Sequence, residues 1–115
     1  MGDTEGARQW LLPAWERLAQ ASDDERAAVA WALVAARDGV GTDWLPRIEA
    51  AANGLPRDAA VGFAAGMLLA ECGLWGKAGR WLERAARDDA LDPAMRRQAW
   101  VALARLAENE DDAVR

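Results

Sequence analysis

The chain has 115 residues, of which 52% are hydrophobic, and a formal net charge of −5 from 14 basic and 19 acidic side chains. This length predicts one domain, residues 1–115, with a modest core. The acidic balance argues against nucleic acid as the main partner, because a phosphate backbone attracts positive charge. No stretch approaches the roughly 18 to 20 uncharged apolar residues of a membrane span, and the N-terminus lacks the basic-then-apolar order of a signal peptide.

The composition favours helices over strands. Alanine dominates the hydrophobic residues, β-branched residues are few, and tyrosine and histidine are absent. Strands draw on β-branched and aromatic residues, so we expect an all-α fold. Cys72 is the only cysteine, which excludes an internal disulfide and fits a reducing, cytosolic compartment. We expect Cys72 to be a small buried side chain near a helix end.

The first predicted helix covers residues 5–20, where Trp10 and Leu18 belong to an apolar stripe at helical spacing. Pro13 interrupts the stripe. The helix is therefore either kinked at Pro13 or begins near Leu12, and the sequence leaves both alternatives open.

The second predicted helix covers residues 24–38. Ser22 and Glu25 have the spacing of a capping box at its start, and Gly39 suits a left-handed C-cap at its end.

The third predicted helix is shorter. Thr42 or Asp43 can cap it, and Pro46 lies in its first turn, where a missing N–H does little harm. Asn53 and Gly54 end it.

Two further helices are predicted in the middle of the chain. Pro56 opens one that runs to Cys72, with Gly73 as its stop, and the next runs from about Leu74 to Asp88.

The sequence matches itself at a shift of 34 residues. Matched pairs include Gly39 with Gly73, Ile48 with Leu82, and Ala52 with Ala86. A period of 34 made of two antiparallel helices is the tetratricopeptide unit. We therefore predict tetratricopeptide-like helical hairpin repeats in an α-α superhelix of about six helices, with units 25–58 and 59–92. The alternative is an ordinary alanine-rich bundle with accidental self-similarity.

The last helix is predicted from the pair Asp92-Pro93, a cap followed by proline at the first helical position, to about Asn109. It resembles the first helix of a third, partial unit over residues 93–115, whose second helix is missing.

Small residues mark the places where helices are expected to approach closely. Gly66 and Ala78 take these places in the second unit, and a larger side chain would push the helices apart. In the first unit Trp44 stands where Ala78 stands in the second. We therefore expect the first unit to pack more loosely or at another angle.

The sequence is similar to the C-terminal repeat region of the proteobacterial HemY family. The segments that carry the resemblance are 73–78 (GLWGKA), 81–83 (WLE) and 102–106 (ALARL), and the upstream segment 10–15 (WLLPAW) is compatible with it. Segment 74–78 is the most specific of these, and the resemblance covers the last two thirds of the chain.

The resemblance implies a function in late haem biosynthesis. HemY proteins are tetratricopeptide proteins that N-terminal helices hold in the bacterial inner membrane, with the repeats on the cytoplasmic side. Those membrane helices have no counterpart in this sequence, so the implied location is cytoplasmic, at the cytoplasmic face of the inner membrane for a full-length protein.

The residue types argue against catalysis, so we do not expect an enzyme. The chain has no histidine, which removes the commonest base for a nucleophilic Ser, Cys or Thr. Acidic pairs such as Asp88-Asp89 lie at predicted helix ends, where they act as caps.

A haem would have only Cys72, Met67 and Met95 as axial ligands, which is a poor set, so we expect no cofactor. No metal site is predicted, because no calcium-loop series of oxygen ligands occurs.

A basic cluster includes Lys77, Arg80 and Arg84 on one side of a predicted helix, and acidic lipid headgroups are one conceivable partner. We favour local neutralisation by opposite charges four residues apart. The expected pairs are Glu83 with Arg87 and Arg84 with Asp88.

In a tetratricopeptide array the first helices of successive units line a concave face, where partners usually bind. The predicted partner-binding residues are Val29, Leu33, Arg37, Phe63, Met67, Glu71, Val101 and Arg105, with Arg26 and Gln98 nearby. An apolar stripe with a polar rim suits an amphipathic helix laid in a groove.

We therefore predict a non-catalytic scaffold that binds a protein or peptide partner through its concave face. The alternatives are a structural domain that self-associates, as a homodimer, through the same surface or the last helix, and an auxiliary part of a porphyrin enzyme.

Overall fold

All regular structure in the computed structural model, which describes the backbone of residues 4–114 and the side chains of residues 4–108, is helical. The α-helices of this part are α1 (Thr4–Glu16), α2 (Asp23–Ala35), α3 (Leu45–Gly54), α4 (Ala59–Glu71), α5 (Trp75–Ala86) and α6 (Pro93–Val114). Single 3-10 turns precede α2 (η1, Leu18–Gln20) and α3 (η2, Thr42–Trp44). The prediction of an all-α fold with six helices is confirmed for the described residues.

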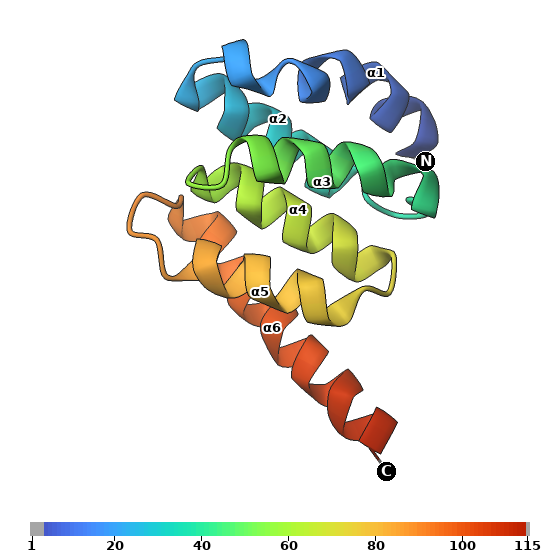
Figure 1. Ribbon diagram of the computed structural model, residues 1–115. Helices are drawn as coiled ribbons and strands as arrows, with labels where there is room; N and C mark the ends of the chain where they lie inside the picture. Colours follow the sequence, from blue (N-terminus) through green and yellow to red (C-terminus); the bar gives the residue numbers. More distant parts are fainter. Residues whose placement is uncertain (1–3, 115) are drawn as a thin grey trace.

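The helices stack in chain order from α1 to α6 (Figure 1). In this view α3 and α5 lie in front, α2 and α6 lie behind them, and the C-terminal part of α6 extends beyond α5. The described chain therefore has two large faces, one formed mainly by α3 and α5 and the other by α2, α4 and α6.

Helix α4 is the centre of the fold. Every residue from Val61 to Leu69 is buried, and α4 packs against α2, α3, α5 and α6. A helix that is apolar on all sides is stable only when its neighbours cover it all round. The core of the domain therefore surrounds α4.

Several helix ends lie where the sequence predicts them. The hydroxyl of Ser22 accepts a hydrogen bond from the Glu25 N–H at 3.2 Å, and the carboxylate of Asp92 accepts one from the Ala94 N–H at 2.8 Å. Gly73 follows α4 with a φ of 82°, the left-handed conformation that glycine tolerates best. These contacts satisfy main-chain groups that a helix leaves unpaired at its ends.

The predicted start of α4 at Pro56 is wrong by three residues, since the helix begins at Ala59. Asp58 caps it, because its carboxylate accepts a hydrogen bond from the Val61 N–H at 3.0 Å. A carboxylate that accepts a hydrogen bond from a free N–H at the start of a helix determines where the helix begins, whereas the first turn merely tolerates a proline.

The predicted end of α2 at Asp38 is also wrong, since the helix ends at Ala35. The chain leaves the helix there and turns at Gly39, which has a φ of 78°. The side chain of Arg8, far away in the sequence, binds main-chain carbonyl groups of this turn and so stabilises the earlier ending.

The predicted helix over residues 5–20 is divided into α1 and η1. Helix α1 begins at Thr4 and includes Pro13, so it does not begin near Leu12. Trp15 then fixes α1 against α3, because its indole N–H donates a hydrogen bond to the Arg47 carbonyl oxygen at 3.0 Å.

The two 34-residue units pack differently. In unit 59–92, α4 and α5 form the most extensive helix contact of the fold, whereas in unit 25–58, α2 and α3 touch little and each packs on α4. Trp44, which is 6% exposed, stands in the first unit where Ala78 stands in the second. From this replacement the sequence predicts that the first unit packs more loosely or at another angle. The equivalence of the two units as repeats stays a prediction.

Candidate functional site

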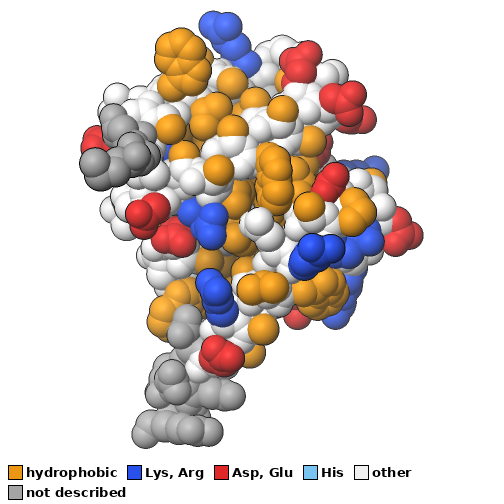
Figure 2. Space-filling view, turned by 180° about the vertical axis from the view of Figure 1, so that it is seen from behind, with side chains coloured by type: hydrophobic (Ala, Val, Ile, Leu, Met, Phe, Trp, Pro, Cys, Tyr) orange, Lys and Arg blue, Asp and Glu red, His pale blue; other side chains and the backbone are white. Residues whose placement is uncertain are grey.

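A groove lies between the end of α2, the second half of α4 and the middle of α6, with a volume of about 500 Å³. We call it the α2–α4–α6 groove and define it by six of its lining residues, Arg37, Met67, Glu71, Arg97, Val101 and Arg105. Figure 2 shows the molecule from the side opposite to Figure 1, where hydrophobic side chains gather along the middle with charged side chains among them.

The base of the groove is apolar. Met67 and Leu106 are each 7% exposed, and Ala70 and Ala102, which are half-buried, lie beside them. Val101 is 49% exposed and is therefore free to lose contact with water when a partner binds. The α6 residues Gln98, Val101 and Arg105 share one side of the helix because they are three and four positions apart.

The rim of the groove is positively charged. Arg37 forms an ion pair with Glu71 at 3.4 Å and also donates a hydrogen bond to the Val34 carbonyl oxygen at 2.7 Å. Arg97 and Arg105 form no ion pair with any residue whose side chain the structure describes. Three arginines therefore face one glutamate in a protein whose net charge is −5.

The structure brings together five of the eight residues predicted to bind a partner. These are Arg37, Met67, Glu71, Val101 and Arg105. Val29 is half-buried against the core and does not line this groove.

The prediction that Leu33 and Phe63 form part of the surface is wrong, since both side chains are 0% exposed. Trp31 covers Phe63, with 5.9 Å between the ring centroids, and is itself 38% exposed. The 34-residue register matches Val29 with Phe63 and Leu33 with Met67, but it does not show which side of each helix faces the core, so it did not reveal the burial of Leu33 and Phe63. Their burial makes them core residues.

Arg26, which the sequence places near the concave face, has another role. Its guanidinium donates to the Leu18 carbonyl oxygen at 2.8 Å and lies 3.5 Å from the Asp58 carboxylate. Arg26 thus joins η1, α2 and the start of α4, away from the groove.

Sequence reasoning missed Arg97 and Trp75 as groove residues. Arg97 lies four positions before Val101, so the i, i+4 spacing on the last helix could have indicated it. Trp75 lies at the start of α5, and no local pattern shows that it reaches α6.

Cys72 lies at the end of α4, as expected from the sequence, but it is half-buried rather than buried, and its Sγ lies 3.8 Å from the Gly41 carbonyl oxygen. Burial, and then the carboxylates of Glu71 and Asp43, raise the pKa of its thiol. A thiol that keeps its proton is a weak nucleophile.

The basic cluster on α5 does not form the expected pairs. Neither Glu83 with Arg87 nor Arg84 with Asp88 is an ion pair in the described part of the chain. The side chains reach the neighbouring elements instead, because these offer partners that are held in place by the fold. Lys77 binds Glu49 of α3, and Arg84 binds the main chain after α3.

A scan of the sequence against protein-family models gives no match, and searches of the curated proteins and of the solved structures give none either. The resemblance to the HemY repeats therefore stays a prediction. Among the described helices, none combines the length and the apolar character that crossing a membrane requires. Within the same part of the chain, no three His, Cys, Asp or Glu side chains come together as a metal site.

Proposed function

We propose that this chain is a non-catalytic scaffold of the tetratricopeptide type that binds an amphipathic helix of another protein in the α2–α4–α6 groove. The observation that carries the proposal is the half-exposed Val101 over an apolar base, between two arginines that lack ion-pair partners in the described chain. Such a groove offers apolar contact and charge to the same ligand.

The apolar part of the groove supplies the affinity. Transfer of a valine-sized side chain out of water contributes about 1.5 kcal/mol, and a partner helix with two or three such contacts reaches several kilocalories before association entropy is subtracted. Val101, which is 49% exposed, and Trp75, which is 38% exposed, supply the accessible apolar surface, because Met67 at the base is only 7% exposed.

The charged part of the groove selects the partner. Arg97 and Arg105 are free to form charge-assisted hydrogen bonds with carboxylates, whereas Arg37 already forms an ion pair with Glu71. We therefore infer that the partner helix is acidic beside its apolar stripe. Like charges at these positions would be repelled, which gives specificity.

The cellular setting of the proposal comes from the resemblance to the HemY repeats. We propose on that basis that the scaffold acts in the cytoplasm, at the inner face of a bacterial inner membrane, and holds a protein of late haem biosynthesis.

A second copy of the chain is the alternative occupant. Trp100 and Val101 are each 49% exposed on α6, which is the apolar surface that a homodimer would cover. Sedimentation of the protein alone distinguishes this case, because a dimer forms without any added peptide.

The groove is tested with a designed helical peptide of about 14 residues, or about four turns, that carries leucine at core spacing and glutamate beside it. A matched peptide with lysine in place of glutamate is the control. We expect the glutamate peptide to bind at least about tenfold more tightly in calorimetry, with a difference that shrinks as salt is added. Equal binding of both peptides would contradict a role for the arginines.

A variant pair locates the binding surface. Arg105→Gln should weaken the glutamate peptide, whereas Arg17→Gln, at an exposed arginine of the segment after α1, should not. Loss of binding in both variants would place the peptide elsewhere.

A further inference from the structure

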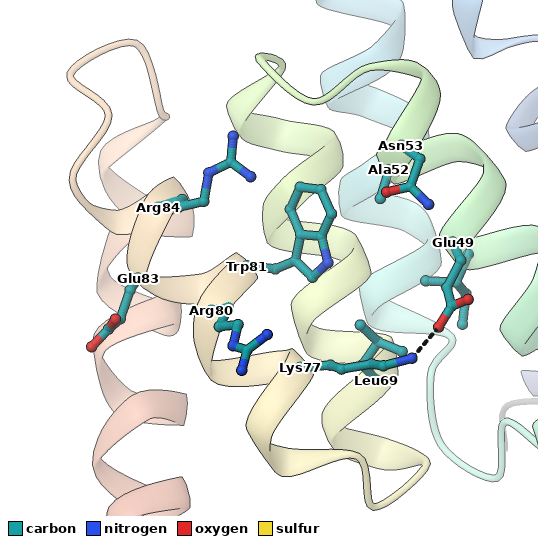
Figure 3. Close-up of a pocket in the computed structure, with 10 residues that line it drawn as sticks. Glu49, Ala52, Asn53, Leu69, Lys77, Arg80, Trp81, Glu83 and Arg84 are labelled. Carbon is teal, nitrogen blue, oxygen red and sulfur yellow. Dashed lines mark hydrogen bonds and ion pairs between the residues drawn. The ribbon is translucent and has the colours of Figure 1, made fainter.

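A second cavity lies on the opposite side of the molecule from the groove, between α3 and α5 and above α4 (Figure 3). We call it the α3–α5 cavity. Its volume is about 530 Å³, within the range of pockets that hold small molecules. Its base is apolar and closed, because Ile48, Ala52 and Leu69 are each at most 1% exposed.

Two contacts between α5 and the α3 region frame the cavity. Lys77 Nζ lies 2.9 Å from Glu49 Oε1, and the Arg84 guanidinium donates a hydrogen bond to the Pro56 carbonyl oxygen at 3.1 Å. Lys77, Trp81 and Arg84 share one side of α5 because they lie four and three positions apart. The contacts therefore bridge α5 and the α3 region on both sides of Trp81.

Trp81 forms one wall of the cavity. The Arg84 guanidinium lies over the indole with its Cζ 5.1 Å from the ring centroid, which fixes the orientation of the ring. In Figure 3 the indole nitrogen points away from Arg84 and toward the space between α5 and α3. Across that space lie Asn53 and Glu49.

Two donors of this cavity lack a partner in the described chain. The Arg80 guanidinium and the indole N–H of Trp81 form no hydrogen bond or ion pair with any residue whose side chain is described. Arg80 lies toward the Lys77 end of the cavity in Figure 3, whereas Glu83 points away from it. A ligand that enters the cavity therefore meets free donors beside an apolar base.

The local charge favours a ligand with a single negative charge. At the Lys77 end, Lys77 and Arg80 each carry one positive charge and Glu49 carries one negative charge, which leaves a net charge of +1. Arg84 and Glu83 also line the cavity and add one charge of each sign, so the net charge of the whole lining stays at +1, which matches a singly charged anion best. A carboxylate carries one charge, and its planar shape matches a guanidinium.

We propose that the α3–α5 cavity binds a small monocarboxylate with a flat apolar body. The carboxylate lies at Arg80, and the apolar body packs on the half-buried Trp81 ring, over the closed base of Ile48, Ala52 and Leu69. The site is separate from the α2–α4–α6 groove and does not rest on the function proposed for it.

The probe for this site is 2-naphthoate, with 2-naphthamide as its uncharged match and acetate as the carboxylate without an apolar body. The full ¹⁵N-labelled chain is titrated, and the indole N–H signal of Trp81 is assigned by its absence in Trp81→Phe. We expect 2-naphthoate to shift this signal saturably. Both 2-naphthamide and acetate should bind at least about tenfold more weakly, since each lacks one part of the recognised ligand.

Arg80→Gln should weaken 2-naphthoate at least about tenfold without changing the thermal midpoint. Arg97→Gln, in the groove on the other face, is the matched control and should bind the probe as the unaltered chain does. The proposal is overturned if Arg80→Gln keeps its affinity, if 2-naphthamide binds equally well, or if Trp81 shows no saturable shift up to about 10 mM probe. Shifts that gather at Val101 instead would assign the probe to the groove and also overturn it.

Discussion

Arg8 of α1 and Asp38 of the loop after α2 are joined by a hydrogen bond of 2.7 Å from the guanidinium to the main-chain carbonyl oxygen. The same guanidinium donates to the Ala36 carbonyl oxygen at 2.8 Å, and Arg8 is only 5% exposed. These carbonyl groups follow the last turn of α2, where a helix leaves acceptors unpaired and carries partial negative charge. Arg8 thus caps α2 from a different helix.

Replacement of Arg8 should therefore destabilise the fold. Arg8→Met keeps much of the side-chain volume but leaves the carbonyl groups without their donor, and we expect the free energy of unfolding to fall by about 2 to 3 kcal/mol. Arg17→Met, at an exposed position just after α1, should change it by less than about 0.5 kcal/mol. Urea denaturation followed by circular dichroism measures both, and similar shifts in the two variants would contradict the capping role.

Gly66 provides a test of the close contact between α4 and α5. A Cβ atom at Gly66 would lie 2.6 Å from Cγ of Leu82 and 3.2 Å from the main-chain oxygen of Ala78. Gly66→Ala should lower the free energy of unfolding by about 1 to 3 kcal/mol, because the two helices must move apart.

Gly79→Ala is the matched control within α5. A Cβ atom there meets nothing within 4 Å, so the exchange should stabilise the protein by about 0.4 to 1 kcal/mol through helix propensity and a less flexible unfolded chain. Opposite signs are expected for the two glycines in thermal melts. Stabilisation by both would show that α4 and α5 do not approach as closely as the structure places them.

Ala78→Leu should also destabilise, by about 1 to 3 kcal/mol, because Ala78 is 0% exposed at the same contact. The sequence alone favours Arg84→Leu as a silent control, since Arg84 is placed on the solvent side of α5. In the structure Arg84 binds the Pro56 carbonyl oxygen and stacks on Trp81, so its replacement should also lower the free energy of unfolding. Ala28→Leu, at an exposed position of α2, is the better control, and equal melting shifts for the two leucine variants would contradict the packing at Ala78.

The raised pKa of the Cys72 thiol predicts a loss of stability at alkaline pH. Below the ordinary pKa of 9.0, the thiol is protonated in both the folded and the unfolded chain, so its contribution to the free energy of unfolding is fully present and does not change with pH. Above that pH the unfolded chain releases the proton first, and the free energy of unfolding falls until the pH passes the raised pKa of the folded state. Cys72→Ala should remove this part of the slope, and an unchanged slope between pH 8 and 10 would refute the assignment.

Local chemistry accounts for what the sequence predicted correctly. The caps at Ser22 and Asp92 and the turn at Gly73 each involve residues only a few positions apart, so their geometry depends on neighbours that the sequence shows. The close approach at Gly66 could be predicted because Gly66 and Ala78 are small residues on the two successive helices of one unit.

The contacts that the sequence could not show join distant parts of the chain. Arg8 reaches the turn after α2, Trp15 reaches the Arg47 carbonyl oxygen, and Lys77 reaches Glu49. Each contact depends on the crossing angles of helices, which a hydrophobic pattern on one helix does not determine. The sequence therefore indicated part of the groove lining, since Val101 and Arg105 line the groove, whereas Phe63 is buried in the core. Partner binding by Val101 and Arg105 stays a prediction.

The burial of Phe63 and the exposure of Val101 lead to opposite outcomes for the same substitution. Phe63→Glu places a carboxylate where the side chain is 0% exposed, so we expect a loss of more than about 4 kcal/mol and an unfolded or molten chain. Val101→Glu, at a position that is 49% exposed, should leave the folded state intact.

Val101→Glu should nevertheless weaken the glutamate peptide at least about tenfold, because it adds negative charge to the groove and removes apolar contact. Circular dichroism reports folding and calorimetry reports binding in the same samples. A folded Val101→Glu variant that binds the peptide with unchanged affinity would exclude the α2–α4–α6 groove as the binding surface. A folded Phe63→Glu variant would instead show that α4 is less covered than its burial indicates, and the two results together separate the packing of the domain from its function.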